Sequence, residues 1–175
     1  MDSKLIIGIS AVFCFVAFGR VAQLYIWPRL LVLSREDALN VLVVPHMFRF
    51  VGLSFLTPGI VSPNLSPAFA DPAAYGDLAA AVLAVVATFA LTARTSWALA
   101  TVWLLNLEGT IDLLFAYYQG VIGVGLPPGA LGSAFYIPTV IVPPLLVTHL
   151  MMFRLLLRGR VRIIEAGASS GVPSR

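Results

Sequence analysis

Residues 97–119 read WALATVWLLNLEGTIDLLFAYYQ, an apolar run that also carries two carboxylates, Glu108 and Asp112. A helix needs about 20 mostly apolar residues to cross the roughly 30 Å hydrocarbon core of a bilayer. This run has that length, and similar runs occur along the rest of the chain. It therefore indicates a membrane-spanning helix that keeps ionisable groups inside the bilayer.

The composition of the whole chain indicates the same class of protein. Of its 175 residues, 59% are hydrophobic and 11% are charged, whereas soluble domains average roughly 45–50% apolar and about 25% charged residues. We predict an all-α fold, a polytopic transmembrane bundle. The net charge of +3 does not indicate a nucleic-acid partner, because the basic residues gather at helix ends and in the tail.

Five apolar runs are separated by turn-rich or charged breaks. Aromatic residues near several run ends suit the headgroup region of a membrane. The third run is the shortest and is rich in alanine. The predicted spans cover about residues 5–27, 38–56, 77–93, 97–119 and 134–157.

Two of the breaks, residues 57–76 and 120–133, are rich in Pro and Gly, and we expect no regular element in either. Residues 1–158 then form a single membrane-embedded domain. Residues 159–175 form a basic tail, whose composition predicts a short interfacial segment followed by disorder.

The Lys and Arg residues of the breaks predict the orientation of the bundle. Arg29 and Arg35 follow the first span, Arg94 follows the third, and further Arg residues follow the fifth. The breaks after the second and fourth spans contain neither Lys nor Arg. Because cytoplasmic loops carry the excess of Lys and Arg, we predict the N-terminus outside and the C-terminus in the cytoplasm. We expect the protein in a bacterial inner membrane or a plasma membrane.

Polar residues inside the predicted spans are the candidate functional residues, because each ionisable group costs at least a few kcal/mol in lipid and usually faces the bundle interior. At a rise of 1.5 Å per residue, Arg20, His46 and His149 come out about 12 Å from the cytoplasmic ends of their helices. Others come out near the midplane, so we expect one shared polar layer. The candidate residues are Arg20, His46, Arg49, Asn106, Glu108, Asp112 and His149.

The spacing of these residues places some of them on common helix faces. His46 and Arg49 are three apart, and Glu108 and Asp112 are four apart, so each pair shares a face. Asn106 projects to a different side. Because the two Arg residues and two carboxylates balance, one interpretation is a purely structural network that fixes helix packing. Histidine adds a group that titrates near neutral pH, which charge pairing alone does not require.

Two prolines interrupt the fifth span. Pro143 and Pro144 remove N–H donors and should leave the carbonyls of Thr139 and Val140 without helical partners. In lipid, such carbonyls are satisfied by neighbouring groups, water or a ligand. The single cysteine, Cys14, excludes an intramolecular disulfide, and we interpret it as a packing residue.

The favoured functional hypothesis is a membrane-embedded acid–base enzyme of the isomerase, cyclase or hydratase type that acts on a lipid or a small lipophilic molecule. Glu108 or Asp112 would be the proton donor or base, and His46 or His149 the complementary proton carrier. No cofactor is required. Charge balance or contact with the substrate would come from Arg49, Arg20 and Asn106.

Three alternatives remain open. His46 and His149 lie on oppositely running helices at matched depth, which fits a bis-imidazole haem b site for electron transfer. Carboxylates and histidines can also form the proton relay of a proton-coupled channel or transporter, for which five helices per chain would need a homo-oligomer. A structural or assembly subunit without chemistry needs only the charge network.

The sequence contains no phosphate-binding loop, dinucleotide fingerprint, HExxH or CxxC motif. Acidic, His and Trp residues in so small a helical bundle resemble, in general style, the membrane sterol isomerases of the emopamil-binding type and the small membrane terpene cyclases. No motif of either family aligns with this chain, so the resemblance implies no residue roles. By analogy it favours the enzyme hypothesis over the haem hypothesis.

Overall fold

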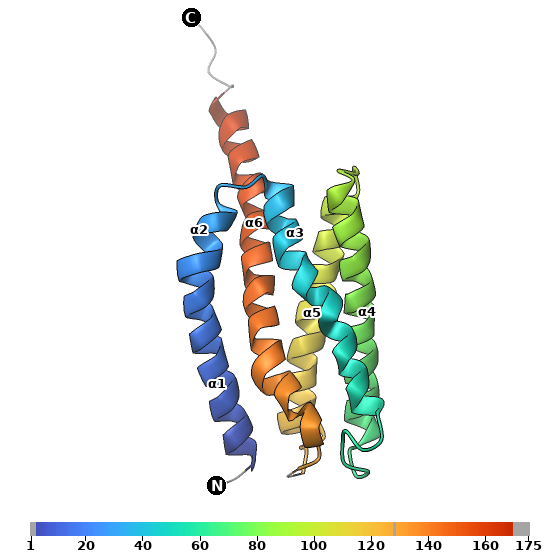
Figure 1. Cartoon of the computed structure of the whole chain (residues 1–175). Helices are drawn as coiled ribbons and strands as arrows, with labels where there is room; N and C mark the ends of the chain where they lie inside the picture. The colour runs from blue at the N-terminus through green and yellow to red at the C-terminus, as the bar shows by residue number, and fades with distance from the viewer. Residues whose placement is uncertain (1–2, 128, 170–175) are drawn as a thin grey trace, which may run out of the picture.

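The computed structural model describes residues 3–127 and 129–169, with side chains described for residues 5–127 and 129–158. The described part is helical and contains no strand. Long helical segments run side by side as an up-and-down bundle, with α1 at one edge beside α6 (Figure 1). The predicted all-α fold is confirmed.

The helices follow one another with short connections. The first half of the chain forms α1 (Ser3–Val21), the π-helix η1 (Ala22–Ile26), α2 (Trp27–Leu30), α3 (Arg35–Val43) and the 3₁₀-helix η2 (Val44–Leu56). The second half forms α4 (Pro67–Thr92), α5 (Ala98–Tyr118), η3 (Gln119–Gly123), η4 (Gly132–Phe135), η5 (Ile137–Ile141) and α6 (Val142–Ser169).

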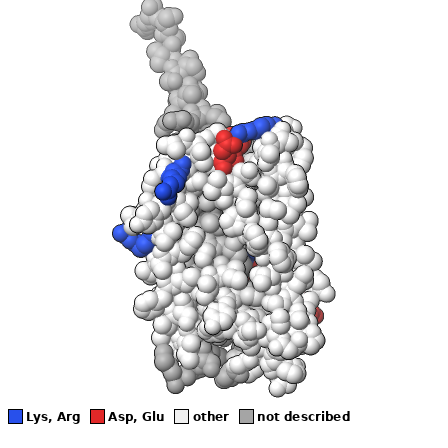
Figure 2. All heavy atoms as spheres, in the orientation of Figure 1, with Lys and Arg blue, Asp and Glu red and all other residues white. Residues whose placement is uncertain are grey.

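Within the described residues, five helical segments are long and apolar enough to cross a membrane, as the hydropathy pattern predicts. This length and composition indicate an integral membrane protein. The side surface seen in Figure 2 is nearly free of charge, and Lys, Arg, Asp and Glu gather toward one end. The five segments are Leu5–Leu30, Arg35–Leu56, Pro67–Thr92, Ala98–Gly123 and Gly132–Arg158.

The third segment corrects one prediction. The Pro-rich break before it was expected to form no regular element, but α4 begins at Pro67 and is 26 residues long. Pro67 occupies the first turn, where its missing N–H costs nothing and its fixed φ suits a helix. The predicted span begins ten residues too late, because a proline in the first turn starts this helix and does not break it. Part of the predicted disordered tail is also helical, since the backbone of α6 continues to Ser169, and residues 170–175 lie outside the described residues.

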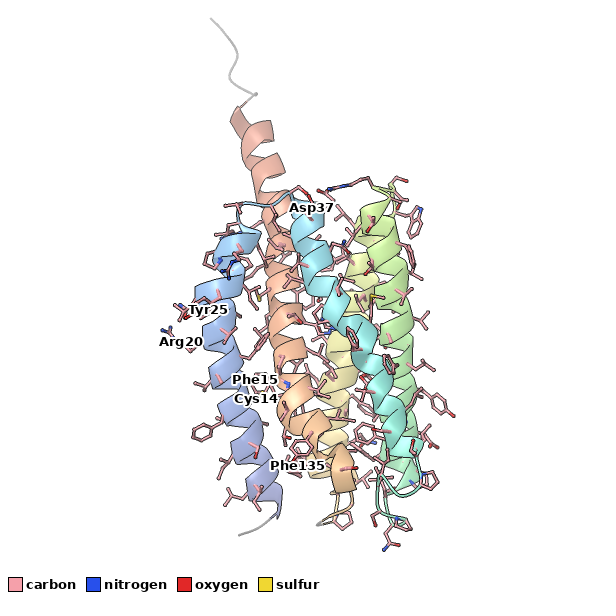
Figure 3. The ribbon with its side chains drawn as sticks, viewed as in Figure 1. Cys14, Phe15, Arg20, Tyr25, Asp37 and Phe135 are labelled. Carbon is pink, nitrogen blue, oxygen red and sulfur yellow. The ribbon has the colours of Figure 1, made fainter. Side chains whose placement is uncertain are left out.

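Two proline interruptions are compensated by side chains from neighbouring helices. Pro72 cannot donate to the carbonyl of Ala68, and Gln119 Nε2 donates to that oxygen at 3.5 Å. In the fifth segment the carbonyl of Val140 accepts from Cys14 Sγ at 3.5 Å, as the proline pattern predicts. Cys14 thus points from α1 toward the fifth segment (Figure 3). It is a hydrogen-bond donor in addition to a packing residue.

The interior of the bundle is divided into two apolar clusters with a polar layer between them. On α4 the first cluster ends at Ala74 and the second begins at Ala80, with Asp77 between them. On α5 the polar stretch lies between Leu105 and Leu113. On the segment formed by α3 and η2, and on α6, buried polar residues also lie between members of the two apolar clusters. The polar layer therefore crosses four helical segments at a common level.

Candidate functional site

The winding of η2 brings its functional side chains onto one face. The buried residues of this 13-residue 3₁₀-helix are His46, Arg49, Gly52 and Phe55, spaced by three. A 3₁₀-helix has three residues per turn, so these positions are eclipsed, and runs of this length are uncommon. In an α-helix each step of three residues falls about 60° short of a full turn. The 3₁₀ winding therefore keeps all four residues directed at the interior.

Arg49 is the centre of the polar layer. Its side chain is 0% exposed, and Nε donates to Asp77 Oδ1 at 2.7 Å. Nη2 donates to Asp112 Oδ2, and Nη1 points to the carbonyl of Gly109 at 3.4 Å. One guanidinium thus ties η2 to both α4 and α5, in the forked geometry that suits two carboxylates.

Three glycines make this close arrangement sterically allowed. A Cβ at Gly52 would overlap the carboxylate of Asp77, and a Cβ at Gly76 would overlap that of Asp112. At Gly109 an added Cβ would lie 2.6 Å from Arg49 Nη1. Each glycine therefore leaves room for one member of the ion-pair cluster.

The two histidines lie against each other beside Arg49. The ring centroids of His46 and His149 are 4.2 Å apart, and both residues are buried. An added Cβ at Gly109 would lie 2.8 Å from His149 Nε2, so this ring borders the glycine that Arg49 also borders. The predicted convergence of the two histidines and Arg49 is therefore seen in the structure.

Hydrogen bonds define which ring nitrogen carries the proton in the neutral form of each histidine. The Thr148 hydroxyl donates to the carbonyl of Leu145 at 2.8 Å, so it accepts from His46 Nε2 at 3.0 Å. Asn106 Oδ1 accepts from His149 Nδ1 at 2.7 Å. The remaining nitrogens, His46 Nδ1 and His149 Nε2, are buried acceptors with no hydrogen-bond partner among the described residues.

Two predicted members of the layer are placed differently from expectation. Arg20 is exposed, points away from the bundle (Figure 3) and donates to Gln23 Oε1 at 2.7 Å, so its assignment to the shared layer is wrong. A long side chain near a helix end can remain outside the interior in this way. Asn106, expected to point elsewhere, is fully buried and holds His149.

Asp77 is a member of the polar layer that the sequence analysis did not predict. The predicted third span begins at Asp77, whereas the observed helix begins at Pro67 and places Asp77 inside the bundle. The signal that could have found it is Ser66 followed by Pro67, a typical helix start. With Asp77 included, the layer holds one guanidinium against the carboxylates of Asp77, Glu108 and Asp112. The predicted charge balance is therefore wrong among the described residues, and carboxylates are in excess.

An apolar cavity of about 240 Å³ adjoins the ion-pair cluster. Among the described residues, Asp77 and Asp112 are its charged lining residues, while Glu108, His46 and His149 do not line it. The hydroxyl of Tyr117, also in the wall, is occupied by donation to the carbonyl of Pro138 at 2.5 Å. Other lining residues come from α1, η2, α4, α5 and α6 and include Ile7, Ala11, Phe55, Phe69, Leu113 and Val142.

The geometry of the histidine pair does not fit a bis-imidazole haem. An axial pair of ligands must hold the macrocycle between the two rings, but these rings are in direct contact. His46 Nε2 and His149 Nδ1 are also engaged by Thr148 and Asn106. The described residues likewise contain no group of three or more His, Cys, Asp or Glu side chains arranged to hold a metal ion.

Fold and site together define an all-helical protein with five segments long and apolar enough to span a membrane and with a polar layer between its two apolar clusters, within the described residues. Residues 6–157 match the family described as a domain of unknown function (DUF8737), and the chain belongs to this family. No curated protein and no solved structure matches the chain.

Proposed function

We propose that this protein is a membrane-embedded enzyme that performs acid–base chemistry, of the isomerase, cyclase or hydratase type, on a lipophilic substrate. The observation that carries the proposal is the apolar cavity whose charged lining groups, within the described part of the chain, are Asp77 and Asp112. The apolar walls of such a cavity suit a hydrocarbon body, while two carboxylates offer proton transfer at its wall. A purely structural charge network would not need the cavity.

The excess of carboxylates in the polar layer favours a proton on one of them. Even with Arg49 paired to Asp77, the carboxylates of Asp112 and Glu108 remain, and an uncompensated charge is costly away from water. A proton on Asp112 reduces this excess. Because Asp112 also lines the cavity, that proton is available to a bound substrate.

The simplest reaction that balances is a shift of a double bond. Asp112 donates its proton to one carbon of the double bond, and the resulting carboxylate removes a proton from the carbon adjacent to the other end. Asp112 regains its proton, and no co-reactant is consumed. Arg49 is the positioning residue, since it holds Asp112 through Nη2 and stabilises the transient carboxylate.

The orientation and the location belong to the same proposal. The distribution of Lys and Arg supports an N-terminus outside and a C-terminus in the cytoplasm of a bacterial inner membrane or a plasma membrane. In this orientation the cavity lies in the outer half of the bundle, because its walls include Leu126 and Leu131, which lie in the break after the fourth segment.

The experiment uses solvent deuterium as the readout, because deuterium on carbon reports proton transfer whatever the identity of the substrate. Purified protein in lipid nanodiscs is incubated in D₂O with a total membrane lipid extract, and lipids are compared by mass spectrometry. Wild type should introduce carbon-bound deuterium into at least one lipid species. Asp112→Asn should abolish this incorporation, and Asp37→Asn, an exposed carboxylate paired with Arg94, should retain it. Equal labelling by wild type and Asp112→Asn would overturn the proposal.

A cavity-filling pair of variants tests where the substrate lies. Ala116 lines the cavity on α5, whereas Ala100 on the same helix is exposed on the bundle surface. Ala116→Leu should lower deuterium incorporation at least tenfold, and Ala100→Leu should leave it near the wild-type level. The opposite order would place the reaction outside this cavity.

A second candidate function is proton movement across the membrane, favoured by the contact between His46 and His149 beside Arg49. The ring nitrogens that have no hydrogen-bond partner among the described residues are proton acceptors in the same polar layer as Arg49. Liposomes that contain a pH-sensitive dye distinguish this function from the enzyme. Faster proton flux than in empty liposomes, lost in Asp112→Asn, would support a relay. Flux equal to that of empty liposomes would exclude it.

A further inference from the structure

We propose that the substrate of this cavity carries a protonated amine on a compact hydrocarbon body, with the ammonium group bound by Asp77. This inference rests on the proposed function, because it names the chemical class of the molecule that occupies the same cavity. It goes beyond that function by assigning a recognition role to Asp77, separate from the proton-transfer role of Asp112.

The hydrogen bonds of Asp77 leave one oxygen available. Arg49 Nε donates to Oδ1, and no described residue donates to Oδ2. Asp77 is 6% exposed, and it is one of the residues that line the cavity. Gly52 packs against the same carboxylate and holds it in place. Asp77 thus presents a fixed acceptor to whatever occupies the cavity.

The charge of the surrounding layer selects a cation over a neutral donor. With Asp112 protonated, the carboxylates of Asp77 and Glu108 still face the single guanidinium of Arg49 among the described residues of the layer. A bound ammonium removes the remaining excess. Opposite charges attract more strongly beside apolar walls than in bulk water, so the carboxylate of Asp77 favours an ammonium over a hydroxyl of the same size. A carboxylate head group would be repelled.

The walls of the cavity select an organic cation over an inorganic one. Apart from the two aspartates, the lining is dominated by Phe, Leu, Ile, Val and Ala side chains. A hard metal cation requires several oxygen ligands, and this wall does not provide them. An amine needs only one acceptor for its N–H groups, while its hydrocarbon body buries apolar surface.

The test compares ligands that differ only in the head group. Binding of 1-adamantanamine, 1-adamantanol and 1-adamantanecarboxylate to the protein in nanodiscs is measured by calorimetry, with empty nanodiscs as the blank for partition into lipid. Wild type should bind the amine at least tenfold more tightly than the alcohol or the acid. Asp77→Asn should remove this preference without loss of affinity for the alcohol, and Asp37→Asn should retain it. Ala116→Leu should weaken the binding of the amine and of the alcohol.

Several outcomes would overturn the inference. Equal affinity for the three ligands would contradict recognition of an ammonium group. Failure of the amine to bind at all would contradict it as well. If ammonium chloride competed as well as 1-adamantanamine, the hydrocarbon body would not contribute to binding. In each of these cases the deuterium experiment with Asp112→Asn decides the proposed enzyme separately, so the two failures can be told apart.

Discussion

Arg49 of η2 donates from Nε to Oδ1 of Asp77 of α4 at 2.7 Å, and both side chains are buried. The pair lies between the two apolar clusters of the bundle, where no apolar side chain could replace the guanidinium without leaving carboxylates uncompensated. The pair joins η2 to α4, so loss of the pair should affect the packing of both helices.

Replacement of Arg49 should be strongly destabilising. In Arg49→Met the carboxylate of Asp77 loses its paired cation and Asp112 loses the donor Nη2, and removal of one partner of a buried ion pair costs about 3–5 kcal/mol. Thermal unfolding in detergent, followed by circular dichroism, measures the change. The triple variant Arg49→Met, Asp77→Asn, Asp112→Asn should recover part of the loss. A triple variant less stable than Arg49→Met would contradict the ion-pair explanation.

Replacement of Arg94 gives the matched comparison at the end of the bundle. Arg94 pairs with Asp37 at 2.5 Å and with Glu36 at 3.4 Å, but all three side chains are exposed to a third or more. Exposed ion pairs contribute about 0–1 kcal/mol. Arg94→Met should therefore lower the free energy of unfolding by less than about 1 kcal/mol. An effect as large as that of Arg49→Met would show that burial is not the cause of the difference.

Gly109→Ala should destabilise the bundle. The added Cβ would lie 2.6 Å from Arg49 Nη1 and 2.8 Å from His149 Nε2, and such overpacking typically costs about 1–3 kcal/mol. Gly19 provides the control, because a Cβ there meets nothing within 4 Å. Gly19→Ala should be neutral or gain up to about 1 kcal/mol from helix propensity. Equal melting temperatures for the two variants would contradict the close approach at Gly109.

The two histidines should adopt opposite tautomers in their neutral forms. Thr148 and Asn106 place the proton on Nε2 of His46 and on Nδ1 of His149. Nitrogen-15 NMR of labelled histidine distinguishes these tautomers. Asn106→Ala removes the acceptor of His149 and should change the tautomer population of that ring alone. Identical tautomers in the wild type would contradict the hydrogen-bond assignment.

The predicted orientation can be tested by cysteine labelling in a Cys14→Ala background. Asn64 is exposed between the second and third segments, and Ser96 is exposed between the third and fourth. In intact cells a membrane-impermeant maleimide should label Asn64→Cys, whereas Ser96→Cys should react only after permeabilisation. The reverse pattern would show the inverted orientation.

Much of the site could be anticipated from residue type and position. His46, Arg49 and His149 lie together in the layer where their depths place them, because a buried polar group in an apolar helix has few neighbours other than similar groups. Arg20 was misplaced because depth alone does not define which way a helix faces. Asp77 was missed because Pro67 and Pro72 obscured the start of α4, and that error also produced the apparent charge balance.

The sequence by itself determined the number of membrane-length helices and the presence of polar groups at a common level, because both follow from the local order of apolar and charged residues. Only the tertiary structure decided which groups meet. The 3₁₀ winding of η2, the room left by Gly52, Gly76 and Gly109, and the rotation of α1 that turns Arg20 outward all depend on packing between segments distant in the chain. The cavity beside Asp77 and Asp112 has the same origin, since its walls come from all five segments.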